Sequence, residues 1–151
     1  MKDALLRDDG AALVEFAIVA TLLFTLFFAV FEFGLIFKDN ILVGQAAANG
    51  ARVASLGAAT STIQSNVTSV GQLQPANMSI ALDYQTMDSA GKLSAWSTLT
   101  NSGSQNAAPS GSQVRVTLNY THPLVMGALF SNAFGSSTST NLKGVVIERR
   151  L

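Results

Sequence analysis

The residues of this chain that are best placed for chemistry are a pair of small residues and a glutamate, at the start of a long apolar run. Gly10 and Ala11 are both small, and Glu15 is the first charge after them. If the chain is cut there, the new ammonium group of Ala11 can reach the Glu15 carboxylate of a neighbouring subunit. Such a pair neutralises both charges at low dielectric constant and fixes the register of packed helices. A cut at this position would therefore create an assembly contact between neighbouring subunits.

The apolar run is long enough to cross a membrane. From Ala11 to Phe37 the only charged residues are Glu15 and Glu32. About 20 apolar residues at 1.5 Å each span a hydrocarbon core of roughly 30 Å. A carboxylate in such a span costs about 3 kcal/mol at the centre and less near an end. An anchor with no other role would not carry Glu15, so we expect this residue to have a partner.

The second acid of the run is predicted to have a different role. Glu32 follows Glu15 by an angle of about 260° around an ideal helix, so the two carboxylates point in different directions. We therefore expect Glu32 at the outer membrane interface, near Lys38 or a partner helix.

Two other interpretations of the run are open. A helix that is apolar on all sides can be the core helix of a soluble protein, but the rest of this chain is too polar to wrap it. The run can also be a secretory signal with its cleavage site at Ala46–Ala48, which would release a free domain. It is longer than the 7–15 apolar residues of such signals, and Glu32 interrupts the approach to the site.

The N-terminal residues resemble a known family. Gly10-Ala-Ala-Leu-Val-Glu15-Phe16 is similar to the prepilin-peptidase motif of type IV pilins. The continuation through Glu32-Phe33-Gly34 and Gln45-Ala-Ala-Ala-Asn-Gly-Ala-Arg52 resembles the TadE-like minor pilins of tight-adherence (Flp-type) pilus systems, with a fainter likeness at Val114 to Pro123. The resemblance implies prepilin cleavage between Gly10 and Ala11, assembly and register through Glu15 and Phe16, and helix packing at Glu32, Gly34, Gly50 and Arg52.

The same resemblance implies the partners and the location. A minor pilin or pseudopilin works with other pilin subunits, a pilus assembly platform, a prepilin peptidase and the lipid bilayer. It lies in the cytoplasmic (inner) membrane as a single-pass protein and can reach the pilus or the cell surface. Lys2 and Arg7 precede the span, and the positive-inside rule then favours a cytoplasmic N-terminus and an extracytoplasmic C-terminal domain.

Composition argues against several other classes. The net charge is zero, which disfavours nucleic acid as a partner because no basic stripe exists to follow phosphates. Hydrophobic residues make up 48% and charged residues 12%, as in an extracytoplasmic membrane protein. The chain has no cysteine and one histidine, His122, which we expect at a turn or a sheet edge. A His-based zinc site is thereby excluded, and Asp83 with Asp88 is only a weak calcium candidate. We expect no cofactor, no metal and no enzymatic activity.

Periodicity predicts an α+β fold: a long N-terminal helix followed by a three- or four-stranded antiparallel sheet. Helical spacing and alanine content favour a helix from Ala11 to Leu56 that stops at Gly57. Alternation predicts strands, and Ser/Thr/Asn/Gly-rich stretches predict loops. The expected strands are Met78–Tyr84, a short one within Lys92–Thr98 around Trp96, Val114–Tyr120 and Gly144–Leu151. The expected loops are 58–69, 98–112 and 131–141, with a turn at His122–Leu124 and a short helix within Val125–Phe134.

The predicted organisation is a cytoplasmic leader (1–10), a long helix (11–57) with a transmembrane half at about 16–37, and a small extracytoplasmic β-rich domain (58–151). Three function classes remain: a minor pilin or pseudopilin of a tight-adherence pilus, a membrane-anchored surface binding module (an adhesin) outside any pilus, and a membrane-tethered enzyme. The missing catalytic set speaks against the enzyme.

Overall fold

The computed structural model describes residues 2–70, 73–127 and 137–151, with side chains from Gly10 onward. Helix α1 runs from Lys2 to Ser55. The chain divides into two compact units, which we call the anchor unit (residues 1–35) and the sheet unit (residues 36–151). Helix α1 belongs to both units.

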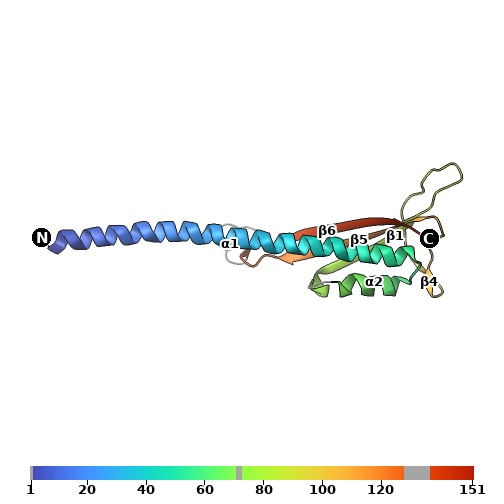
Figure 1. Ribbon diagram of the computed structural model, residues 1–151, viewed down its shortest axis with the longest axis horizontal. Coiled ribbons are helices and arrows are strands. Elements are labelled where there is room, and N and C mark those ends of the chain that lie inside the picture. The colour runs from blue at the N-terminus through green and yellow to red at the C-terminus, as the bar shows by residue number, and fades with distance from the viewer. Residues whose placement is uncertain (1, 71–72, 128–136) are drawn as a thin grey trace. The chain divides into compact units, whose positions relative to one another are not determined.

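The sheet unit contains two sheets (Figure 1). The larger has the strand order β2-β1-β5-β6 and is antiparallel throughout. The smaller is the β3–β4 hairpin. The remaining elements are helix α2 and a 3₁₀ turn, η1. Their bounds are α2 Thr60–Ser69, η1 Pro75–Asn77, β1 Met78–Gln85, β2 Ser97–Thr98, β3 Asn101–Ser102, β4 Gln105–Asn106, β5 Gln113–Pro123 and β6 Ser139–Arg149. The predicted α+β class, with a long helix and a four-stranded antiparallel sheet, is confirmed.

One face of the sheet is covered by both helices. Register places alternate residues of β5 on that face, and they are buried: Val114, Val116, Leu118 and Tyr120. Small residues of α1 meet them, so that the helix backbone lies close to the sheet: Ala46, Ala47, Gly50, Ala51 and Ala54 are all buried. A methyl group at Gly50 would overlap Val67 of α2 and lie 3.4 Å from Val116. Helix α1 therefore packs against both α2 and β5 at this point.

The C-terminal end of α1 is closed by several contacts at once. Gly57 has a φ of +87°, its amide donates to Ala54 O, and the Ala58 amide donates to Val53 O, which is a Schellman stop. The buried side chain of Asn106 in the β3–β4 hairpin donates to Ala54 O and Ala58 O. The end predicted at Gly57 is confirmed, and the hairpin supplies partners for carbonyls that a helix leaves free.

The prediction of a loop at 58–69 is wrong, because most of this segment forms helix α2. Its Ser, Thr and Asn content lowers helix propensity. Ile63 and Val67, one turn apart, are fully buried, and the Thr60 amide donates to Asn101 Oδ1 at the start of the helix. The burial of Ile63 and Val67, together with the hydrogen bond at the start of the helix, outweighs the weak helix propensity of the segment.

The other secondary-structure predictions are met in part. β1, β5 and β6 confirm three expected strands, although β6 begins at Ser139, inside a predicted loop. Of the strand expected around Trp96, only Ser97–Thr98 forms β2, and the predicted loop 98–112 contains the β3–β4 hairpin. His122 and Pro123 lie within β5, so the turn expected there begins one residue later. The expected short helix within Val125–Phe134 lies outside the described residues from position 128 onward.

We expect Gly50→Ala to lower the free energy of unfolding of the sheet unit by about 1–3 kcal/mol, because a methyl group there overpacks the contact with Val67. Gly44→Ala is the matched control: Gly44 is exposed on the same helix and nothing lies within 4 Å of an added Cβ. It should raise the free energy of unfolding by up to about 1 kcal/mol through helix propensity. Denaturant unfolding of the full chain in detergent, followed by Trp96 fluorescence, measures both. Equal effects of the two variants would contradict the packing described here.

Candidate functional site

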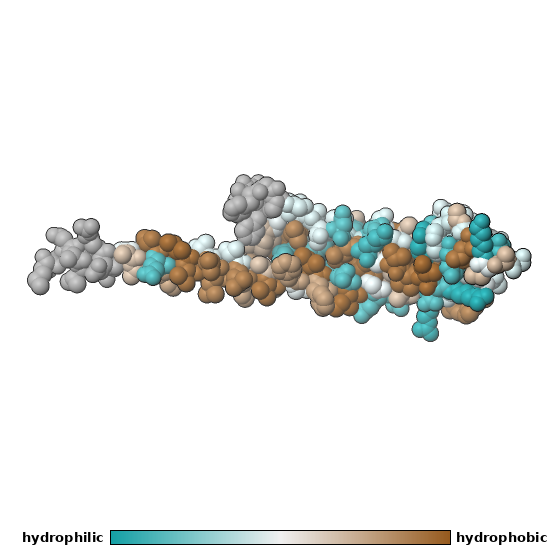
Figure 2. Space-filling model, turned by 90° about the horizontal axis from the view of Figure 1, so that it is seen from above, coloured by the Kyte–Doolittle hydropathy of each residue, from teal (hydrophilic) through white to brown (hydrophobic). Residues whose placement is uncertain are grey.

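From Ala11 onward the anchor unit presents apolar side chains in every direction. Between Gly10 and Ser55 lies an 18-residue window with a mean hydropathy of 2.4, of which none is buried. Leu13, Phe16, Ile18 and Leu22 are each at least 65% exposed, and they do not share one helix face. Figure 2 shows this concentration of apolar side chains along the N-terminal part of α1. A helix of this kind is stable only where lipid or other protein covers it.

Polar groups inside this apolar helix are satisfied by the helix itself. Thr21 Oγ1 donates to Ala17 O and Thr25 Oγ1 donates to Thr21 O, both at 2.8 Å. Each hydroxyl thus bonds a carbonyl one turn earlier, and none needs a water partner. Glu15 differs from them: its side chain is exposed and forms no salt bridge with any residue whose side chain the structure describes.

The proposed cleavage and assembly residues lie close together on the first turns of the anchor unit. Gly10 is exposed, with nothing within 4 Å of an added Cβ. Glu15 follows Ala11 by four residues, which places the two on the same helix face about 6 Å apart along the axis. Phe16 is 70% exposed beside them. The peptide bond after Gly10 and the Glu15 carboxylate are therefore both accessible from outside.

The residues assigned to helix packing fall into two groups. Glu32 is half-buried, while Gly34 is exposed with open space around it, and both lie in the anchor unit. Gly50 and Arg52 lie in the sheet unit, where Gly50 faces α2 and β5 and Arg52 is exposed in the last turn of α1. Lys38, the expected neighbour of Glu32, lies 3.8 Å from Asp39 Oδ1.

A buried polar pair joins α1 to β5, and sequence reasoning missed it. His122 Nδ1 donates to Asp39 Oδ2 at 2.7 Å, and the two residues are only 5% and 8% exposed. His122 is not at the expected turn, because it lies within β5 on the buried face. It does lie past the end of β1, where β5 pairs with β6 alone, so the strand has an open edge at this position. The alternation of Val114 to Tyr120, continued by two residues, would have placed His122 on that face.

The acidic residues considered for calcium are both used by the protein. Asp83 Oδ2 accepts from Arg115 Nη2 at 2.7 Å, and the Arg115 guanidinium lies 4.2 Å from the Trp96 ring centre. Asp88 Oδ1 accepts from the amides of Ala90 and Lys92. The two carboxylates are in separate contacts on β1 and in the loop after it.

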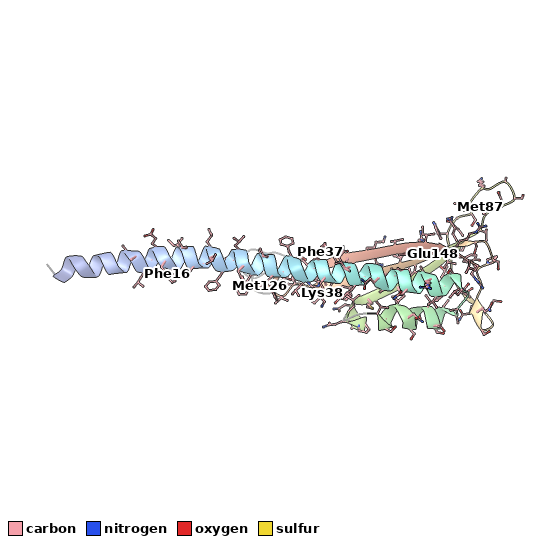
Figure 3. All side chains as sticks on the ribbon, in the orientation of Figure 1. Phe16, Phe37, Lys38, Met87, Met126 and Glu148 are labelled. Carbon is pink, nitrogen blue, oxygen red and sulfur yellow. The ribbon has the colours of Figure 1, made fainter. Side chains whose placement is uncertain are left out.

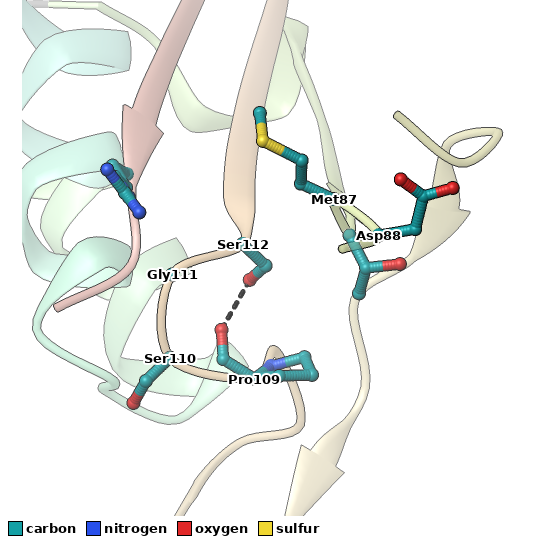
Figure 4. A pocket seen from close by; sticks show the side chains of 8 residues that line it. Met87, Asp88, Pro109, Ser110, Gly111 and Ser112 are labelled. Carbon is teal, nitrogen blue, oxygen red and sulfur yellow. Dashed lines mark hydrogen bonds between the residues drawn. The ribbon is translucent and has the colours of Figure 1, made fainter. Parts of the chain in front are cut away.

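A shallow polar pocket of about 400 Å³ lies beside the start of β5 (Figure 4). Within it Ser112 Oγ donates to Pro109 O at 2.6 Å. Its ionisable lining residues are Asp88, whose carboxylate holds its own loop, and Arg149. The pocket is lined by Thr86, Met87, Asp88, Pro109, Ser110, Gly111, Ser112 and Arg149. This set offers hydrogen-bonding groups to a ligand and holds no histidine or cysteine for nucleophilic chemistry.

Comparison with known proteins supports the N-terminal assignment. Residues 10–52 match the model of the family described as TadE-like protein. The match confirms the resemblance predicted from the sequence for this segment, and it covers most of α1 and none of the sheet. No curated protein and no solved structure matches the chain. A TadE-like segment suggests involvement in tight-adherence pilus systems.

The Asp39–His122 pair provides a test of the junction between α1 and β5. We expect Asp39→Ala and His122→Ala each to lower the free energy of unfolding by about 3 kcal/mol, because each leaves a buried polar partner behind. The double variant should lower the free energy of unfolding by less than the sum of the two single effects, and the difference should be about 0.5–3 kcal/mol. Lys38→Ala is the control: its contact with Asp39 is long and its side chain is 47% exposed, so we expect a change within about 0.5 kcal/mol. Strict additivity in denaturant unfolding would show that the pair is not coupled.

Proposed function

We propose that this protein is a non-catalytic minor pilin or pseudopilin that takes part in assembly of a tight-adherence (Flp-type) pilus through its N-terminal helix. The observation that carries the proposal is the anchor unit. From Ala11 onward it is an apolar helix with exposed side chains in every direction and Glu15 near its start, inside a segment that matches the TadE-like family.

The physical basis of assembly is an exchange of surroundings for the apolar helix. Before assembly the helix lies in the cytoplasmic membrane, with the N-terminus in the cytoplasm and the sheet unit outside. In the assembled state, helices of other pilin subunits replace lipid. The hydrophobic effect contributes little preference between these surroundings, because lipid tails are as apolar as the side chains. A specific polar contact then decides where the helix binds.

Glu15 supplies that contact. After cleavage by a prepilin peptidase, the Ala11 ammonium of a neighbouring subunit pairs with the Glu15 carboxylate. The pair removes two isolated charges from a region of low dielectric constant. It forms in only one axial register, so it orients one helix against the next. The assembly platform and the peptidase are the further partners that this mechanism requires.

Cleavage is tested by N-terminal mass spectrometry of the membrane-extracted protein. We expect wild type to begin at Ala11. Gly10→Leu should keep its original N-terminus, because a large side chain blocks the approach of a peptidase to the following peptide bond. Gly34→Leu is a matched control, since Gly34 is also exposed on α1 but lies far from the cut. A shortened Gly10→Leu product beginning at Ala11 would contradict prepilin processing.

Assembly is tested at Glu15. Glu15→Ala should enter the membrane at least as well as wild type, because a charge leaves the apolar span, and it should still be cleaved. It should lose cross-linking to other pilin subunits and reduce piliation. Glu15→Gln keeps the shape of the side chain without the charge and should show the same loss, because a charged partner is what the mechanism needs.

Three outcomes at Glu15 are distinguishable. Normal piliation by a stably expressed Glu15→Ala protein would remove the main physical support of the mechanism. Normal piliation by Glu15→Gln alone would replace the ion pair with a neutral hydrogen bond. If the variant protein is less stable in the membrane but its cross-linking to other subunits is unchanged, Glu15 pairs with the Ala11 ammonium of its own chain and not with that of a neighbour.

A second candidate is a membrane-anchored surface binding module outside any pilus. The polar pocket beside β5 is the observation that favours it. Purification of the intact pilus separates the two functions: a pilus component remains with the fibre fraction or the assembly machinery, whereas an independent adhesin is recovered with the membrane alone.

A further inference from the structure

We propose that the turn Leu124–Gly127, which follows β5, inserts into the interfacial layer of the lipid bilayer and gives the sheet unit a second membrane contact beside α1. We call these four residues the membrane turn. The inference rests on the membrane anchoring of α1 in the proposed function and extends it to the sheet unit.

The position of the membrane turn follows from chain connectivity and one buried contact. Ile36, the first residue of the sheet unit, is bonded directly to the anchor unit, so the first helical turn of the sheet unit lies next to the membrane. The hydrogen bond of 2.7 Å between Asp39 and His122 holds the C-terminal end of β5 beside that helical turn. Leu124 lies two residues past His122, about 7 Å further in an extended chain.

The surface at this end of the sheet unit is apolar. Val125 is 59% exposed, and on α1 Phe37 and Ile41 are 67% and 46% exposed. In Figure 3, Met126 and Phe37 lie at the same end of the sheet unit, opposite Met87. The membrane turn itself carries no charge. Exposed apolar side chains beside an anchoring helix gain free energy when a bilayer covers them.

The backbone of the membrane turn suits a site with little water. The Leu124 amide donates to Thr138 O at 2.9 Å, and the Gly127 amide donates to Leu124 O at 3.2 Å. Gly127 permits this closed form, because an added Cβ would lie 2.9 Å from the Cα of Thr138. Amides bonded within the protein do not have to be released from water when the turn enters the interface.

Charge next to this surface is also compatible with a bilayer. Lys38 follows Phe37 on α1, and its side chain is 47% exposed. A lysine in this position buries its methylene stem and places its ammonium among lipid phosphates. Phe37 and Ile41 follow the proposed span directly in sequence, and this commits the occupant to lipid and not to a second protein.

The experiment uses the full chain in proteoliposomes. The sequence has no cysteine, so a single introduced cysteine carries the only spin label. Label sites are Val125→Cys in the membrane turn, Phe24→Cys in the span and Met87→Cys as the matched exposed control, since Met87 is 53% exposed. Pro123→Cys, also exposed, gives a second reading should Val125→Cys fail to fold. Power saturation compares collisions with oxygen, which concentrates in lipid, and with a water-soluble nickel chelate.

We expect the oxygen-to-nickel collision ratio at position 125 to be severalfold above that at position 87 and nearer to that at position 24. A ratio at 125 equal to that at 87, with a high ratio at 24, would overturn this inference and leave the anchoring intact. A low ratio at 24 would overturn both. Protection of position 125 from both reagents would mean that protein covers the turn, and this would also overturn the inference.

Discussion

The close approach of α1 to the sheet is the contact on which the sheet unit depends. Glycine and alanine on one side of the helix pack on the buried side chains of β5, and Gly50 marks the point where α2 also packs. The free energy gained by burying apolar side chains is proportional to the buried area, and each small side chain buries little area. Their contribution is to bring the larger residues of β5 and α2 into one dense core. A larger residue at Gly50 would separate α1 from both.

One helix therefore meets two different physical requirements. From Ala11 to Leu35 the residues of α1 are almost all apolar, and its threonine hydroxyl groups bond its own carbonyls, as a helix in lipid must. In the sheet unit the same helix has one buried side of small residues and one exposed side, as a helix in water must. The Asp39–His122 pair lies near this change, where a buried polar contact fixes the strand end to the first turns of the packed helix. Such a contact contributes to the precise geometry of the junction more than to net stability.

The C-terminal end of α1 shows how distant parts of the chain cooperate. The β3–β4 hairpin bonds Ala54 O in the last turn of α1 and Ala58 O just after it through Asn106, and the first amide of α2 through Asn101. The C-terminal residues Arg150 and Leu151 both donate to Ser55 O. A helix end leaves carbonyls without partners, and here they are met by segments that are far apart in sequence. The two helices are thereby joined at this end of the sheet unit.

The sequence by itself determined the apolar span, the long helix with its stop at Gly57, three of the strands and the candidate residues Gly10 and Glu15. These features depend on local periodicity, on the conformational freedom of glycine or on the chemistry of adjacent residues. All three can be recognised within a short stretch of sequence. Only the tertiary structure decided that 60–69 is a helix, that a hairpin caps two helices and that His122 is buried against Asp39. Each of these depends on a partner more than 35 residues away, and local propensity carries no information about such partners.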